Sequence, residues 1–200
     1  MTNTPPSPLV HAPARLEVIC GPMFAGKSTE LIRRLSGAAA SGLRVSAVKP
    51  HIDTRYHATH IATHTGTFFE ARAVERPEQL LELEADVIGL DEAHFYREGL
   101  HDAVMRVLTR EQPSAAGKPG VRVILAGLDR TSLNEPFGEM ARLLIEADEV
   151  VKLTAPCAIC GRTAVHTIRL FDSKEDIVVG GVGMFENRCR EHLNTARPKS

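Results

Sequence analysis

Eight consecutive residues near the N-terminus have the types and spacing that bind phosphate. Gly21 is followed by four residues and then by Gly26-Lys27-Ser28, which is the pattern of a phosphate-binding loop, or P-loop. A largely apolar run, 16–20, precedes the loop and a stretch with helical spacing follows it. Glycines in this context let backbone N–H groups converge on an anion at the start of a helix. The sequence therefore predicts binding of a nucleoside triphosphate.

Two side chains of this loop are expected to act on the phosphates and their metal. Lys27 would reach the β- and γ-phosphates, and the Ser28 hydroxyl would bind Mg²⁺. A glycine-rich turn with a surface lysine is the alternative, and the strand–loop–helix context disfavours it. The predicted ATP-binding residues of the motif are Gly21, Pro22, Met23, Phe24, Ala25, Gly26, Lys27 and Ser28.

An acidic pair further along the chain is expected to complete the phosphate site. The buried strand predicted at 86–90 ends in Asp91-Glu92. Asp91 is expected to hold Mg²⁺, directly or through water. Glu92 is the candidate general base, which would accept a proton from an attacking hydroxyl or water. The alternative is that the pair caps a helix beginning near Tyr96.

Strands and helices alternate along most of the chain, which predicts an α/β fold. The expected strands cover 16–20, 43–49, 86–90, 121–127 and 149–154. The expected helices follow the loop to about residue 40 and cover about 78–84, 97–110 and 138–147. Such alternation is typical of a P-loop parallel sheet flanked by helices. The polar segment 50–67 is expected to contain a functional loop.

The C-terminal part of the chain has the spacing of a metal-binding module. Cys157 and Cys160 form a Cys-x₂-Cys pair, and Cys189 and His192 form a Cys-x₂-His pair after 28 intervening residues. Three thiolates and one imidazole make a complete tetrahedral ligand set, which is typical of structural zinc. The alternative is that these four residues have this spacing by chance, since Cys20 shows that the chain also contains an isolated cysteine.

The predicted organisation is a P-loop domain followed by a small zinc-ribbon-like lid domain. Within the lid domain, 164–170 and 176–179 are expected to pair as a hairpin, and the glycine-rich stretch 180–183 to close over substrate. The boundaries are a disordered tail at 1–13, the nucleotide-binding domain at 14–154, the zinc-binding and lid domain at 155–193 and a tail at 194–200.

Composition and charge exclude several classes of function. With 24 basic and 25 acidic residues the net charge is −1, so no overall basic field attracts nucleic acid or membrane. Aromatic residues make up 4% and Trp is absent, which argues against a stacking platform for bases. No apolar stretch approaches the roughly 20 residues that span a bilayer, and the N-terminus lacks a secretory pattern. We expect a cytoplasmic protein with no nucleic-acid or membrane partner.

The motifs, taken in order, resemble the zinc-containing thymidine kinases of animals and many bacteria. The resemblance runs from about residue 16 to 193 and is carried by 21–31, 53–56, 91–95, 136–138 and 151–155. It implies transfer of the γ-phosphoryl group of ATP to the 5′-hydroxyl of thymidine, with Glu92 as catalytic base, Mg²⁺ and structural zinc. It also implies a homotetramer.

The same resemblance implies further residues at the two substrates. Arg55 corresponds to an arginine near the phosphates, and Thr167 lies where the family approaches the methyl group of thymine. The segment 178–185 corresponds to one that closes over thymidine. The residues implied to bind this substrate are Met23, Asp53, Phe95, Phe137, Thr167, Val178, Val179, Gly180, Gly181 and Phe185.

Four positions depart from the family pattern. His94 stands in place of Gln, Ser132 in place of an aromatic residue, Phe185 in place of Tyr, and Gly183 where an acidic residue is common. The phosphate-binding residues match the pattern, so the departures concern the acceptor rather than the phosphoryl transfer. Two alternatives stay open. One is a P-loop ATPase whose zinc module docks protein or nucleic acid, and the other is a family member that binds nucleotide without turnover.

Overall fold

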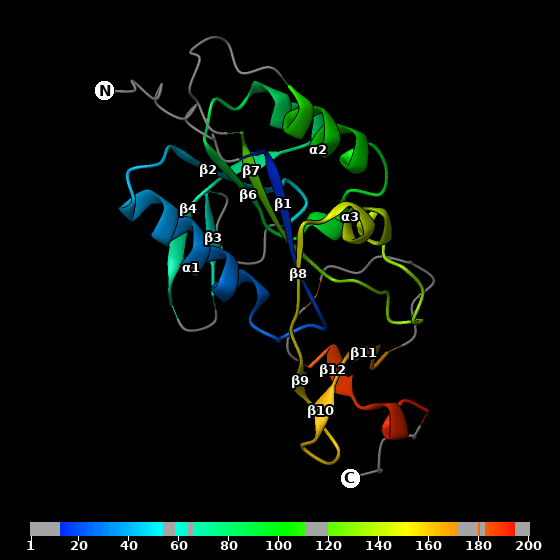
Figure 1. The fold of residues 1–200 in the computed structure, drawn as a ribbon. Coiled ribbons are helices and arrows are strands. Elements are labelled where there is room, and N and C mark those ends of the chain that lie inside the picture. The colour runs from blue at the N-terminus through cyan, green and yellow to red at the C-terminus, as the bar shows by residue number, and fades with distance from the viewer. Residues whose placement is uncertain are drawn as a thin grey trace, which may run out of the picture.

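The computed structural model describes residues 13–53, 59–63, 66–110, 120–171, 180 and 183–194. A central sheet carries helices on both faces, and a smaller lobe of short strands follows the last strand of the sheet (Figure 1). This arrangement confirms the predicted α/β fold with a parallel sheet. The tails at 1–12 and 195–200 lie outside the described residues.

The central sheet contains six parallel strands in the order β5-β2-β6-β7-β1-β8. Five of them occur where the sequence predicts strands, whereas the short edge strand β5 was not predicted. The strands that flank the phosphate loop and the acidic pair, β1 and β6, are separated in the sheet by β7. The bounds are β1 Arg15–Cys20, β2 Val45–Pro50, β5 Arg72–Val74, β6 Val87–Leu90, β7 Arg122–Gly127 and β8 Glu149–Lys152.

Helix α1 (Lys27–Ala40) covers one face of the sheet, and α2 (Leu100–Thr109) and α3 (Met140–Glu146) cover the other (Figure 1). The helix predicted at 78–84 is a 3₁₀ helix, η1 (Pro77–Glu82), so the prediction of an α-helix there was wrong. Helix α2 begins three residues later than predicted, because Gly99 precedes it in a left-handed conformation (φ 80°).

Two apolar cores lie on the two faces of the sheet. In β1, Val18 packs with the residues of α2 and α3, whereas the next residue, Ile19, packs with α1. Strand β7 alternates in the same way, with Leu125 in the first core and Ile124 in the second. Strands buried on both faces must be apolar at successive positions, which is why these strands were visible in the sequence.

A short hairpin, β3 (His60–Ala62) and β4 (Phe68–Glu70), lies beside α1 (Figure 1). Ile61 and Phe69 pack into the core on the α1 face of the sheet. Part of the polar segment 50–67 therefore has a structural role. Residues 54–58 and 64–65 of that segment lie outside the described part of the chain.

The C-terminal lobe consists of two antiparallel strand pairs and a 3₁₀ turn, η3 (Arg190–His192). Strand β9 (Ala155–Pro156) pairs with β10 (Thr163–Ala164), and β11 (His166–Arg169) pairs with β12 (Phe185–Arg188). Strand β11 pairs with β12, whereas the segment 176–179 of the predicted hairpin lies outside the described residues, so that hairpin stays a prediction. Within the described residues, no helix is long and apolar enough to cross a membrane.

A buried carboxylate ties α1 to the sheet. The side chain of Glu17 in β1 is 3% exposed and forms ion pairs with Arg34 of α1 and Arg122 of β7. Arg122 donates two hydrogen bonds to it, of 2.6 and 2.8 Å. Burial raises the pKa of Glu17, but the bonds from Arg122 and Arg34 outweigh burial and leave the pKa below its ordinary value. Glu17 is therefore ionised at neutral pH.

We expect Glu17→Gln to lower the free energy of unfolding by about 3 kcal/mol, because Arg34 and Arg122 would lose the buried carboxylate that they share, although Arg34 would keep Glu30 and Glu149 as partners. Glu149→Gln is the control, since this partner of Arg34 is 37% exposed and its loss should cost under about 1 kcal/mol. Urea unfolding measures both. The folded pKa of Glu17 lies below its ordinary value of 4.5, so its stabilisation is lost as the pH falls below about 4.5 and through the folded pKa, where the wild type and Glu17→Gln should converge. If Glu17→Gln and Glu149→Gln had equal free energies of unfolding at neutral pH, the role of Glu17 as a stabilising buried carboxylate would be contradicted.

Candidate functional site

The predicted phosphate-binding loop connects β1 to α1 as the motif requires. Gly21 has φ 137°, and a Cβ at this position would lie 2.4 Å from the carbonyl oxygen of Leu153. Only glycine fits there, because the loop passes directly against the chain that leaves β8. Gly26 precedes α1 with φ 86°. The N–H groups of the first turn of α1 have no acceptor within the helix, so an anion would be favoured at the loop that precedes them.

The two polar side chains that follow the loop have different partners. The Lys27 ammonium is buried and donates a hydrogen bond of 2.6 Å to the carbonyl oxygen of Pro22, inside the loop. The Ser28 hydroxyl donates to Asp91 Oδ1 over 3.1 Å. Hydroxyl and carboxylate oxygens are the ligands that Mg²⁺ prefers in proteins. The structure thus brings together the two residues predicted to hold that ion.

Asp91 lies in an environment that suits a cation. Burial and the neighbouring charge of Glu92 raise its pKa to about 7, and the charge of Asp53 acts in the same direction. A dication beside the carboxylate would favour its ionised form and offset both causes. The oxygen pair of Ser28 and Asp91 therefore fits Mg²⁺ in chemistry as well as in position.

Glu92 has a backbone conformation that is uncommon for its residue type. Its φ of 51° lies in the left-handed region, which costs free energy in a residue with a side chain. The following 3₁₀ turn, η2 (Ala93–Phe95), is held in place by Tyr96, whose buried hydroxyl donates to the carbonyl of Val74 over 2.7 Å. Such strain occurs often at functional sites. The Glu92 side chain is 16% exposed, and its Oε2 lies 3.5 Å from His94 Nε2.

The acidic pair does not cap α2. That helix begins after Gly99, and no capping hydrogen bond comes from the Glu92 side chain at the start of η2. The alternative interpretation of the pair as a helix cap is therefore wrong.

Two aromatic residues that were expected to contact substrate meet around His94. The ring of His94 lies 4.4 Å from that of Phe95 and 4.6 Å from that of Phe137, measured between centroids. His94 and Phe137 are buried and Phe95 is half-buried. Because η2 follows β6 and Phe137 precedes α3, the fold forms this aromatic wall beside the acidic pair from distant parts of the chain.

Two side chains of the C-terminal lobe form hydrogen bonds with the backbone of Met23 in the phosphate loop. The backbone N–H of Met23 donates to Thr167 Oγ1 over 2.9 Å, and its carbonyl accepts a bond of 2.8 Å from Asn187 Nδ2. Thr167 in turn donates to Asn187 Oδ1 over 3.1 Å. Thr167 was predicted as a site residue and Asn187 was not. No local pattern marks Asn187, because its partner is 164 residues away in the sequence.

Asp53 is buried near the acidic pair. Its carboxylate lies 3.4 Å from the ammonium of Lys49, which is itself 2% exposed at the end of β2. Lys49 was not predicted as a site residue. A buried lysine at a strand end is the signal that points to it, because lysine is rarely buried without an anionic partner.

The remaining predicted substrate residues are only partly described. Gly180 lies against Phe185, since a Cβ on Gly180 would be 2.9 Å from that ring and 2.8 Å from the sulfur of Met184. Phe185 is buried and its ring centroid lies 6.1 Å from that of Phe171. Four predicted residues lie outside the described part of the chain and stay predictions: Arg55, Val178, Val179 and Gly181.

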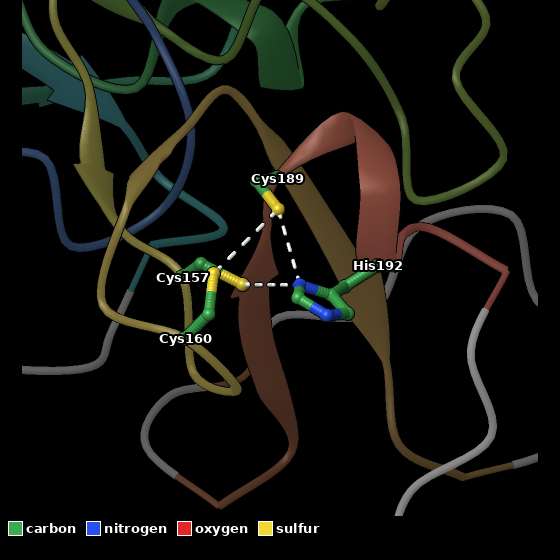
Figure 2. A group of neighbouring side chains, drawn as sticks. All are labelled: Cys157, Cys160, Cys189 and His192. Carbon is green, nitrogen blue, oxygen red and sulfur yellow. Dashed lines mark hydrogen bonds between the residues drawn. The ribbon is translucent and has the colours of Figure 1, made fainter.

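The four predicted metal ligands converge on one point (Figure 2). Their ligand atoms all lie within 4.8 Å of one another. Cys160 Sγ is 3.8 Å from Cys189 Sγ, and His192 Nδ1 is 3.8 Å from Cys157 Sγ and 3.2 Å from Cys189 Sγ. A zinc tetrahedron with Zn–S bonds of about 2.3 Å has sulfur–sulfur edges of about 3.8 Å. The cluster therefore fits a tetrahedral ion in both donor type and size.

Neighbouring groups favour the thiolate of Cys157 and connect the two halves of the cluster. Although burial raises the pKa of Cys157, backbone hydrogen bonds from Cys189, Cys160 and Ile159 lower it to about 5. Arg162, two residues after Cys160, donates a 2.8 Å hydrogen bond to Glu191, which lies between the other two ligands. This outer ion pair joins the two ligand pairs, as outer-shell contacts do at metal sites.

Comparison with known proteins agrees with these geometric findings. A family model described as thymidine kinase matches residues 14–193. The thymidine kinase of Rhodothermus sp. (strain ITI 518) is 39% identical over 187 residues, which cover 92% of this chain and 84% of that protein. The thymidine kinase of Coprothermobacter proteolyticus is 40% identical over 185 residues, covering 88% and 89%. That of Deinococcus radiodurans is 43% identical over 173 residues, covering 80% and 77%.

We expect the purified protein to contain one tightly bound zinc ion. A strong chelator should lower its melting temperature, because binding of a structural metal contributes to the free energy of folding. Cys160→Ser should lose the ion. Cys20→Ala is the matched control, since Cys20 is the one cysteine of the sequence outside the cluster, and it should retain zinc. Metal analysis by mass spectrometry gives the result, and zinc-free wild-type protein would contradict the assignment.

Proposed function

The chain belongs to the thymidine kinase family, and we propose that it transfers the γ-phosphoryl group of ATP to the 5′-hydroxyl of thymidine. The single observation that carries this proposal is the 3.1 Å contact between Ser28 Oγ and Asp91 Oδ1. It supports the proposal because the end of the predicted phosphate loop meets the carboxylate that directly precedes Glu92, and the two contacting oxygens are the candidate ligands of Mg²⁺. Family membership disfavours the alternative of a P-loop ATPase with a docking module.

We assign the phosphate end of the site to the loop and to the residues that follow it. The loop residues 21–28 and the first turn of α1 supply N–H donors to the phosphates of ATP. When ATP binds, the Lys27 ammonium leaves the carbonyl oxygen of Pro22 and contacts the β- and γ-phosphates. Ser28 and Asp91 hold Mg²⁺, which when bound supplies positive charge to the phosphate oxygens. Arg55 is proposed to contribute a further cation there.

The transfer step requires one base. Glu92 accepts the proton of the thymidine 5′-hydroxyl as that oxygen bonds to the γ-phosphorus. The bond from the γ-phosphorus to the bridging oxygen breaks, and ADP leaves with the negative charge. Glu92 then releases the proton to solvent. Nearly all of the acceleration comes from placement and from charge stabilisation, since phosphoryl transfer requires little else from the protein.

Thymidine is proposed to lie between the aromatic wall and the C-terminal lobe. The wall is formed by Phe95 and Phe137, and Met23 presents its side chain from a backbone held by Thr167. Asp53 supports the acceptor end. Residues Val178, Val179, Gly180, Gly181 and Phe185 are proposed to close over the base and exclude water, so that ATP is not hydrolysed without acceptor.

Three further properties belong to the same proposal. The ion of the Cys157, Cys160, Cys189 and His192 cluster is proposed to be zinc, in a structural role, because four protein ligands leave no open position. The division into domains at 14–154 and 155–193 is also proposed, and the position of this lobe beyond β8 supports it. The homotetramer and the cytoplasmic location are proposed from the family resemblance alone.

A product assay tests the proposed function. The purified protein is incubated with Mg-ATP and one of a panel of deoxynucleosides, and with Mg-ATP alone. We expect thymidine monophosphate and ADP in equal amounts, with little ADP when no nucleoside is present. Rapid ADP formation without a phosphorylated nucleoside would overturn the proposal in favour of an ATPase. The absence of any turnover would indicate a protein that only binds nucleotide.

We expect Glu92→Gln to lower kcat by about 10²–10⁴-fold, because the amide cannot accept the proton. Binding of Mg-ATP should change little, since Glu92 is not among the proposed phosphate or metal ligands. Glu98→Gln is the matched control, an exposed glutamate beyond η2, and it should keep the wild-type rate. Initial rates and calorimetric titration with ATP give the two quantities. A wild-type kcat in Glu92→Gln would refute the base assignment.

A further inference from the structure

His94 is a buried imidazole to which the proposed chemistry assigns no role. Its side chain is 2% exposed, and it lies on η2 between the rings of Phe95 and Phe137. Burying a polar ring is unfavourable unless its nitrogens have hydrogen-bonding partners. The contacts of the two ring nitrogens therefore indicate the role of His94.

The contact of one ring nitrogen shows which nitrogen of the neutral His94 ring carries the hydrogen. The backbone N–H of Leu128 lies 3.2 Å from His94 Nδ1 and donates to it. A backbone N–H can only donate, so Nδ1 is the acceptor and the neutral ring carries its hydrogen on Nε2. Gly127 permits this approach, since a Cβ there would lie 3.2 Å from the backbone nitrogen of His94. The end of β7 thus sets both the place and the tautomer of the ring.

The other nitrogen faces the proposed base. His94 Nε2 lies 3.5 Å from Glu92 Oε2. We propose that His94 is a positioning residue for Glu92: Leu128 fixes the tautomer, and the Nε2–H group holds the carboxylate in the orientation that accepts the proton of the substrate hydroxyl. This inference rests on the proposed function, because it requires Glu92 to act as the base.

Glu92 needs such a partner for a physical reason. Its left-handed backbone (φ 51°) directs the side chain, but three further side-chain torsions remain, and the charge of Asp91 repels the carboxylate. The Nε2–H group of His94, 3.5 Å from Glu92 Oε2, is a donor that can counter that repulsion. Because a catalytic group displaced by about 1 Å can cost about 10²-fold in rate, the contact should affect kcat far more than substrate affinity.

Two substitutions separate the hydrogen bond from packing. His94→Leu fills the space between the two aromatic rings and has no donor, whereas His94→Gln retains an N–H that can reach Glu92. We expect His94→Leu to lower kcat by about 10–100-fold with the KM for ATP changed less than about twofold. His94→Gln should recover kcat to within about fivefold of the wild type. If His94→Leu does not fold, His94→Asn replaces it, because its amide is too short to reach the carboxylate.

A double-mutant cycle with Glu92→Gln shows whether His94 acts through Glu92. If it does, His94→Leu should have almost no further effect on kcat in the Glu92→Gln background. An equal loss in both backgrounds, or a failure of His94→Gln to recover activity, would overturn the inference and leave the base assignment intact. A wild-type rate in Glu92→Gln alone would overturn the base assignment and this inference with it.

Nitrogen-15 NMR provides a readout that does not depend on turnover. Two-bond proton–nitrogen correlations distinguish the two neutral tautomers of histidine, and we expect the signal of His94 to show hydrogen on Nε2. His94→Gln identifies this signal by its loss. A ring protonated on Nδ1 would overturn the inference, because Nε2 could then donate nothing to Glu92.

Discussion

The arrangement of the site depends on one contact, in which the Ser28 hydroxyl meets the carboxylate of Asp91. The two residues follow β1 and β6, which are not neighbours, because β7 lies between them in the sheet. The contact forms because parallel strands direct their carboxyl ends to one edge, where the start of α1 spans the interval. Gly21 makes this path available, since any side chain there would collide with Leu153. The phosphate loop and the acidic pair are thus positioned by the sheet order itself.

The C-terminal lobe completes this loop from the other side. Both backbone polar groups of Met23 are bonded to side chains of that lobe, Thr167 on β11 and Asn187 on β12. Two residues after Asn187 comes Cys189, one of the four converging metal ligands. The cluster therefore fixes the end of β12. The side-chain amide of Asn187 on this strand is bonded to the phosphate loop, so the cluster is connected through β12 to the nucleotide end of the site.

Sequence patterns predicted what is local and missed what depends on tertiary contact. The phosphate loop, the metal ligand spacing and the strands buried on both faces are visible because each is defined by short-range chemistry. The 3₁₀ helix at Pro77–Glu82 was mistaken for an α-helix, since proline and apolar residues begin both kinds of turn equally well. The pairing of β11 with β12 was not predicted, because strand pairing is not encoded locally. Asn187 went unnoticed because its partner Met23 is distant in the sequence. Lys49 went unnoticed although its partner Asp53 is only four residues away, because the burial of its ammonium depends on the fold.

The charges at this edge of the sheet explain why the site suits a cation-bearing substrate. Asp53, Asp91 and Glu92 lie close enough that the two neighbours raise the pKa of Asp91 to about 7, together with burial. Lys49 offsets only part of this negative charge, through Asp53. A bare triphosphate would be repelled by such a cluster, whereas a triphosphate carrying a dication relieves it. A triphosphate that carries a dication would therefore relieve the repulsion among these carboxylates, which would favour it over the bare triphosphate before any chemistry begins.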